Sequence, residues 1–292
     1  MTRACHRAAA WLISAALIAV AQTPANTPLD VRLPLESGSV RFAVIGDSGT
    51  GEAAQYQLAA QMERYRQATN FDFVIMLGDN IYGGHNADDF HNKFELPYQP
   101  LLAAKVKFYA CLGNHDDAQQ EILYQPFNMN GQRYYSYSRG GAEFFALDSN
   151  YMDPAQLGWL DHNLAQSGAQ WKIVYLHHPL FSDGKFHGPD LDVRTRLLPL
   201  LEKYGVNAVF SGHEHVYERF TPQDGIFFFI EGNSGQLRFR DLRQAPDEAA
   251  GSDTVQDFML VELDKKKMVF QTISRSGYTV DAGTEPKQAP PK

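Results

Sequence analysis

Five short apolar runs, each of a length suited to one β-strand, end in a similar way, and this repetition constrains the fold more than any other feature. We predict strands at 40–46, 72–77, 107–112, 172–176 and 206–210. Most of these runs lead into Gly and then into a side chain that can bind a metal ion. The endings are Ile45-Gly46-Asp47, Leu77-Gly78-Asp79, Leu112-Gly113-Asn114-His115, Leu176-His177-His178 and Ser211-Gly212-His213-Glu214-His215. Because the carboxyl ends of strands form the ligand crevice of an open α/β sheet, we expect these side chains to converge.

Longer amphipathic stretches separate the strands and are predicted as helices at 52–67, 154–166 and 190–203. Asp153-Pro154 supplies an N-cap followed by proline at the first helical position. This alternation of strands and helices is typical of a mostly parallel sheet.

Two other regions, 133–148 and 226–273, hold strand patterns without intervening helices, and the second contains a hairpin turn at 264–267. Strands of both kinds predict two mixed β-sheets packed face to face with helices outside, a four-layer α/β/β/α sandwich.

The first 21 residues have the layout of a cleavable signal peptide. Arg3 and Arg7 precede an apolar run at 8–20, and cleavage is expected after Ala21. An uncleaved membrane anchor is the alternative, but about 13 apolar residues are fewer than the roughly 20 that span a bilayer. We therefore expect a secreted or periplasmic protein without a stable membrane anchor.

The rest of the chain is predicted to be a single catalytic domain with short flanking segments. A linker is expected at 22–38, the domain at 39–282 and a mobile tail at 283–292. Of the two cysteines, Cys5 lies in the predicted signal peptide, so the mature chain, with Cys111 alone, cannot form an internal disulfide.

The net charge of −8 argues against a nucleic-acid partner, because the surface should repel polyanions in general. An anionic substrate must instead be attracted by a local positive centre, for which bound metal ions are the obvious candidates.

The metal-capable residues divide into two chemical groups. Asp47, Asp79 and Tyr82 are hard oxygen donors, and an ionised tyrosine suits a trivalent ion such as iron(III) better than magnesium or calcium. The neutral donors Asn114, His177 and His213 suit a divalent partner. Asp79 could bridge the two ions, and pairs of this kind activate a hydroxide and stabilise charge on a phosphoryl group.

The five motifs together resemble those of the purple acid phosphatases, which belong to the calcineurin-like metallophosphoesterases. The resemblance spans roughly residues 40–220, and the single-domain length is similar to that of the small members of the family. The series is Gly46-Asp47-Ser48-Gly49, Gly78-Asp79-Asn80-Ile81-Tyr82, Gly113-Asn114-His115-Asp116, Val174-Tyr175-Leu176-His177 and Gly212-His213-Glu214-His215.

The resemblance implies an acid phosphatase that hydrolyses small-molecule phosphate monoesters by in-line attack of a metal-bound hydroxide. It assigns iron(III) to Asp47, Asp79, Tyr82 and His215, and the second ion, divalent iron, zinc or manganese, to Asp79, Asn114, His177 and His213.

The resemblance also implies three residues outside the ligand set. His115 would contact the substrate phosphate or help protonate the leaving group, and Asp116 would orient His115. His187 would be a second histidine beside the metals, whereas His178 is expected to pack beside Pro179.

Three alternatives remain open. The nearest is a relative with another metal pair that acts on phosphodiesters or cyclic nucleotides. The second is a catalytically silent binding module, against which the complete ligand set argues. The third is a structural metal site, although such sites are usually cysteine-rich and mononuclear.

Overall fold

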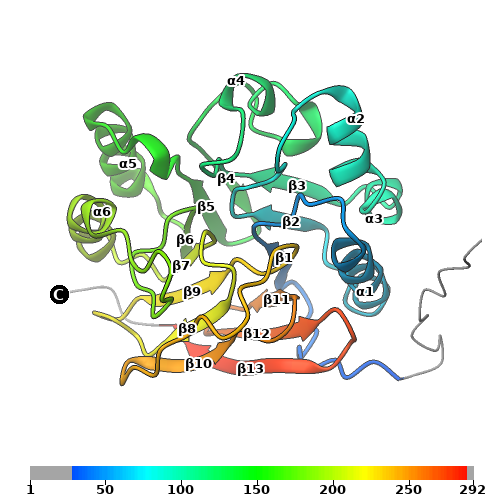
Figure 1. Cartoon of the computed structure of the whole chain (residues 1–292). Helices are drawn as coiled ribbons and strands as arrows, with labels where there is room; N and C mark the ends of the chain where they lie inside the picture. Colours follow the sequence, from blue (N-terminus) through cyan, green and yellow to red (C-terminus); the bar gives the residue numbers. More distant parts are fainter. Residues whose placement is uncertain (1–27, 288–292) are drawn as a thin grey trace, which may run out of the picture.

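The structure, a computed structural model, describes residues 28–287. The predicted signal peptide at 1–21 and the first part of the predicted linker lie outside the described residues. The described chain forms two β-sheets that pack face to face, with helices on the outer side of each (Figure 1). The predicted four-layer α/β/β/α architecture is confirmed.

The first sheet has six strands in the order β13-β12-β11-β1-β2-β3. β1 (Val40–Ile45), β2 (Phe73–Met76) and β3 (Lys107–Ala110) run parallel to one another. β11 (Asp257–Leu263), β12 (Lys267–Ser274) and β13 (Thr279–Pro286) extend the sheet in antiparallel pairing.

The second sheet has seven strands in the order β10-β8-β9-β7-β6-β5-β4. The four central strands β5 (Ala142–Ala146), β6 (Trp171–Leu176), β7 (Ala208–Ser211) and β9 (Phe227–Glu231) are parallel. The outer strands join by antiparallel pairing: β4 (Tyr135–Arg139) at one edge, and β8 (Tyr217–Phe220) followed by β10 (Glu248–Ser252) at the other.

The three long predicted helices are present as α1 (Ala53–Thr69), α5 (Pro154–Gln166) and α6 (Leu191–Lys203). The sequence patterns did not predict the short helices, because each has too few residues for a helical period to be recognised. These are α2 (Ala87–Phe90), α3 (Gln99–Ala103) and α4 (Ala118–Glu121), together with a π-helical turn at His91–Glu95 and 3-10 turns at Gln125–Phe127 and Ser149–Tyr151.

Three apolar clusters fill the spaces between the four layers. Alternate residues of a strand face opposite sides of its sheet, so Phe42 and Val44 of β1 lie between the sheets whereas Ala43 and Ile45 face α1. A third cluster lies between the second sheet and α5 and α6. Within the central cluster the Phe42 ring stacks on Phe73 at 5.1 Å.

The predicted linker and tail both contribute to the first sheet. Leu33 is buried, and the backbone N–H groups of Leu35 and Glu36 donate to Glu262 of β11. The prediction of a mobile tail from residue 283 is wrong for its first part, because β13 pairs with β12 through Pro286. An edge strand with polar residues lacks the apolar alternation that would have revealed it.

Two smaller predictions can also be checked. The hairpin turn at 264–267 is confirmed, since the Asp264 carboxylate accepts hydrogen bonds from the backbone N–H groups of Lys266 and Lys267. Cys111 is a buried free thiol. Among residues 28–287, no helix is both long enough and apolar enough to cross a bilayer.

We predict that Phe42→Ala lowers the free energy of unfolding by about 3–5 kcal/mol, because it leaves a cavity between the sheets. Phe42 is fully buried and also meets Phe144 edge-on at 5.3 Å. Denaturant titration would measure the loss. Leu123→Ala, at a site that is 71% exposed, is the control and should change stability by less than about 0.5 kcal/mol. A Phe42→Ala loss below about 1 kcal/mol would contradict the packing described.

Candidate metal centre

The predicted metal ligands meet where the carboxyl ends of parallel strands from the two sheets adjoin. Asp47 and Asp79 follow β1 and β2, while His177 and His213 follow β6 and β7. Hydrogen bonds join the sheets here: among them, the His177 ring N–H at Nδ1 donates to the Leu77 carbonyl at 2.9 Å, and the His213 backbone N–H donates to Asp47 Oδ2 at 2.8 Å. The side chains that follow these strands therefore converge, as predicted.

Three of these ligands have a left-handed backbone, which non-glycine residues rarely adopt. The φ angles are 52° at Asp47, 50° at Asp79 and 71° at His213. The chain reverses direction as it leaves each strand and thereby points the side chain into the crevice. A β-carbon on Gly113 would lie 2.2 Å from Asp79 Oδ1, so glycine is required there for the loops to approach each other. Backbone strain of this kind is concentrated at functional sites.

One half of the site is rich in oxygen. Donor atoms of Asp47, Asp79 and His215 all lie within 4.8 Å of one another. The Tyr82 hydroxyl donates to Asp47 Oδ1 at 3.0 Å and lies 3.2 Å from His215 Nε2. These four residues are the set that the resemblance assigned to iron(III).

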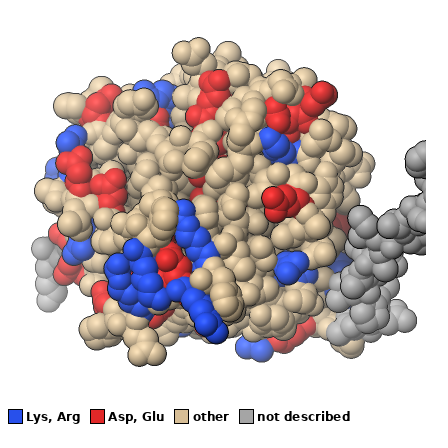
Figure 2. Space-filling view, in the orientation of Figure 1, with Lys and Arg blue, Asp and Glu red and all other residues tan. Residues whose placement is uncertain are grey.

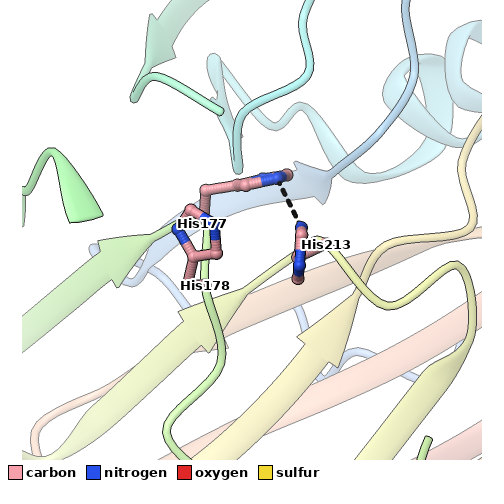
Figure 3. Close-up of side chains that lie close together, drawn as sticks. All are labelled: His177, His178 and His213. Carbon is pink, nitrogen blue, oxygen red and sulfur yellow. Dashed lines mark hydrogen bonds between the residues drawn. The ribbon is translucent and has the colours of Figure 1, made fainter. Parts of the chain in front are cut away.

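The other half is rich in nitrogen. His177 Nε2 lies 3.0 Å from Asn114 Oδ1, 3.1 Å from His213 Nδ1 and 3.5 Å from Asp79 Oδ1. Figure 3 shows the contact between His177 and His213 as a dashed line, with His178 beside them. Since Nδ1 of His177 donates to Leu77, its Nε2 keeps a lone pair directed at these neighbours. Asp79 contacts both halves, as a bridging ligand would.

The electrostatics favour bound cations. Burial and the neighbouring Asp79 raise the pKa of Asp47, and burial and Asp47 raise the pKa of Tyr82. Burial also lowers the pKa of His177 well below its ordinary value, and it lowers the pKa of His215 to about 4. These directions favour the neutral form of His177 and His215, which metal binding requires, and cations would stabilise the ionised oxygen donors. Donor types and their arrangement thus fit a pair of metal ions.

Asp116 has a different position from the one predicted. Its carboxylate accepts hydrogen bonds from the backbone N–H groups of Asn80, at 2.7 Å, and Gly113, at 2.8 Å, and from the Asn80 side chain. The proposed orienting bond to the His115 ring is replaced by these contacts. Asp116 instead holds the loops after β2 and β3 together. The position of Asp116 in the sequence motif could not distinguish this structural role from a catalytic one.

The other two predicted residues lie at the mouth of the site. His115 is exposed, and its ring centre is 5.0 Å from that of Tyr82. His187 lies on the loop that precedes α6, and its ring stacks on His213 with centres 4.1 Å apart. Both rings lie beside the metal ligands.

Three further residues near the centre had no functional role in the sequence analysis, which expected only that His178 packs beside Pro179. The buried Glu214 carboxylate accepts hydrogen bonds from the backbone N–H groups of His187, at 3.1 Å, and Gly188. Arg238 Nη1 donates to His187 Nδ1 at 3.2 Å. The His178 ring forms a hydrogen bond with the Ser149 hydroxyl at 2.8 Å. Its ring nitrogen also lies within 4.8 Å of ring nitrogens of His177 and His213, close enough for the three to bind one metal ion. The position of Glu214 in the sequence, between His213 and His215, could have indicated that it lies at the site. Arg238 belongs to no motif, so the sequence did not indicate its position.

The comparisons with known proteins agree with this geometry. The family model described as calcineurin-like phosphoesterase matches residues 40–217. The chain therefore belongs to the calcineurin-like phosphoesterase family.

Sequence relatives narrow the class. The chain is 25% identical to tartrate-resistant acid phosphatase type 5 of Rattus norvegicus, over 90% of this chain and 95% of that protein. It is 30% identical to purple acid phosphatase 7 of Arabidopsis thaliana, over 68% of this chain and 71% of that protein. These relatives place the chain among the purple acid phosphatases, and it is a phosphoric ester hydrolase.

Solved structures show the same fold at lower sequence identity. Purple acid phosphatase PPD1 from Lupinus luteus superposes with a TM-score of 0.67 at 19% identity, over 86% of this chain and 54% of that chain. A dimetal phosphatase from Danio rerio gives 0.66 at 16% identity, over 85% of this chain and 99% of that chain. GAP50, described as the anchor in the inner membrane complex of Plasmodium, gives 0.73 at 19% identity, over 86% of this chain and 90% of that chain. Likeness at this level concerns the fold alone.

We predict that Asp79→Ala loses the metal pair, because it removes the carboxylate that lies beside the donor nitrogen of His177 and also within the cluster of Asp47 and His215. Metal affinity should fall by more than about 100-fold, since even residues behind the ligands change it by 10–100-fold. Elemental analysis of the purified variant would measure the metal content. Asp161→Ala is the matched control, because Asp161 pairs with Lys203 on the outer helices. Full metal content in Asp79→Ala would contradict the bridging position.

Proposed function

We propose that this protein is an acid phosphatase that hydrolyses phosphate monoesters at a centre of iron(III) and a divalent ion, which is iron, zinc or manganese. The observation that carries the proposal is the position of Tyr82, whose hydroxyl lies within hydrogen-bond distance of both Asp47 and His215. An oxygen-rich set that includes tyrosine favours a trivalent cation, and the adjoining nitrogen-rich set favours a divalent one.

The chain provides the ligands in the two sets already described. Asp47, Tyr82 and His215 would hold iron(III), Asn114, His177 and His213 would hold the divalent ion, and Asp79 would contact both. When bound, such a metal pair supplies a nucleophilic hydroxide at acid pH and neutralises charge on the phosphoryl group. The remaining steps, substrate binding and proton transfer, would be carried out by side chains at the mouth of the site.

His187 is suited to protonate the departing alcohol. Arg238 can only donate, so His187 Nδ1 accepts its hydrogen bond and the ring proton of the neutral form is on Nε2. Burial and Arg238 lower the pKa of His187, so the imidazolium that acts as general acid is populated only at low pH. This direction agrees with an acid phosphatase. His115, exposed beside Tyr82, would contact the phosphate or share the same task.

The alcohol part of the substrate has room beside Asn114. A hollow there is lined by Asn114, Asp117, Asp148, Asn150 and Tyr151, among others. The lining is polar and acidic, so it favours neutral or cationic groups over additional anions.

We predict that the purified protein absorbs visible light through a tyrosinate-to-iron transition and that Tyr82→Phe abolishes this band. The phenyl ring of Phe fills the same space but has no oxygen to bind iron. A visible spectrum of both proteins at equal iron content tests the metal assignment. Tyr56→Phe is the matched control, because its hydroxyl bonds only the Asn92 carbonyl at 2.9 Å on the surface. A colourless, zinc-loaded protein would favour the alternative, a diesterase with another metal pair.

The reaction is tested with two substrates that share a leaving group. We predict that the metal-loaded protein hydrolyses p-nitrophenyl phosphate at acid pH with at least about tenfold higher kcat/KM than bis-p-nitrophenyl phosphate, because two metal ions neutralise the doubly charged monoester best. Preference for the diester would refute the monoesterase proposal. Absence of hydrolysis of either substrate would favour a silent binding module.

We further propose that the protein is secreted or periplasmic after removal of residues 1–21. The support is the sequence pattern, with Arg3 and Arg7 before the apolar run at 8–20. Intact-mass analysis of protein from the producing cells should give a chain that begins at Gln22. A mass that includes Met1 through Ala21 would overturn this proposal.

A further inference from the structure

Two segments beside the metal centre run antiparallel to each other outside the main sheets. A bridge joins Gly184 to Leu242. The Lys185 backbone N–H donates to the Asp241 carbonyl at 2.9 Å, and the Arg243 backbone N–H donates to the Asp183 carbonyl at 3.0 Å. Because these bonds are between backbone groups, they hold the two segments together whatever side chains they carry.

This pairing gathers four cationic side chains, which we call the cationic rim: Lys185, Arg238, Arg240 and Arg243. Lys185, Arg240 and Arg243 are exposed, and Arg238 is half-buried. Figure 2 shows a group of Lys and Arg side chains, with acidic atoms between them, on the face above β7 to β9. A concentration of positive charge is unexpected in a chain of net charge −8.

The rim begins at the metal centre itself. The Arg238 backbone N–H donates to the carbonyl of His215, and its guanidinium contacts His187. The guanidinium carbon lies 3.8 Å from the centre of the Phe186 ring, and that of Arg240 lies 5.2 Å from the Phe239 ring. Both arginines therefore have an aromatic surface that limits their motion.

The neighbouring carboxylates are more buried than the rim cations. Glu214 is buried, its Oε1 accepts the His187 and Gly188 N–H groups, and its Oε2 lies 3.8 Å from Arg238 Nη1. Asp183 and Asp241 are half-buried, and each has one carboxylate oxygen with no exposed surface. The exposed cations of the rim are therefore Lys185, Arg240 and Arg243.

We propose that the cationic rim binds a second phosphate group of the substrate, while the phosphate to be cleaved occupies the metal centre. This inference rests on the proposed function. Guanidinium groups bind phosphate oxygens through strong, charge-assisted hydrogen bonds, often in pairs. On the other side of the centre, Asp117 lines the hollow beside Asn114 and repels such a group, whereas the buried Asp148 there is paired with Arg133. A doubly phosphorylated substrate is therefore bound in one orientation, with its second phosphate toward His187.

The test uses a matched pair of compounds that cannot be hydrolysed, propane-1,3-bisphosphonate and propylphosphonate. Calorimetry with the metal-loaded protein should show that the bisphosphonate binds about tenfold more tightly, since exposed ion pairs contribute up to several-fold each. The preference should decrease as salt is added. In the triple variant Lys185→Gln, Arg240→Gln, Arg243→Gln the preference should fall to about twofold or less, with propylphosphonate binding unchanged.

A second triple variant controls for total charge. Lys107→Gln, Lys265→Gln, Lys266→Gln removes three exposed cations at the amino ends of β1 and β3, the opposite edge of the sheet. It should retain the full preference. Arg240→Gln alone, which leaves the contacts of Lys185 and Arg243 in place, should lose part of the preference even if the rim triple variant folds poorly.

The outcomes separate this inference from the proposed function. Equal binding of the two phosphonates by the wild type, or an equal loss in both triple variants, overturns the rim proposal even if p-nitrophenyl phosphate is hydrolysed. A preference that depends on the rim in a protein without phosphatase activity supports the rim and refutes the proposed function.

Discussion

The close approach of Asp47 and Asp79 at the shared edge of the two sheets is the constraint on which the rest of the structure depends. Two buried carboxylates repel each other, and burial together with Asp79 raises the pKa of Asp47. The backbone at both residues is left-handed as well. The two packed sheets position the loops in this arrangement, and bound cations would offset the repulsion. Metal binding would then add to the free energy of unfolding.

Hydrogen bonds orient the candidate metal ligands at this shared edge of the sheets. The Leu77 carbonyl fixes the proton of His177 on Nδ1 and directs its Nε2 at the centre. Since Leu77 comes from the first sheet and His177 from the second, one hydrogen bond both aligns a ligand and joins the sheets. Asp116 joins the loops after β2 and β3 by accepting hydrogen bonds from backbone N–H groups of both loops. Residues that resemble catalytic groups in the sequence can thus serve to hold the ligands in place.

The mouth of the site combines two different surroundings. Near Asn114 the walls are polar and acidic, whereas near His187 the cationic rim faces solvent. Glu214 connects this second side to the metal ligands, because it lies between His213 and His215 and holds the loop that carries His187. With the function proposed here, substrate selection would depend on loops outside the five motifs, where members of one family can differ while the metal centre remains the same.

The amino-acid sequence determined the layers of the fold and the set of candidate metal ligands, because both follow from local patterns. Apolar runs of strand length marked β1, β2, β3, β6 and β7, and the polar residues after them had to meet once the strands were parallel. It did not reveal the course of β13, the short helices or the contacts of Asp116, since these depend on pairing and packing with distant residues. Only the tertiary structure placed Arg238 beside His187 and gathered Lys185, Arg240 and Arg243 into one rim. The sequence does not indicate that the segment around Lys185 pairs with the segment around Leu242. The hydrogen bonds between them are made by backbone groups, which every residue has.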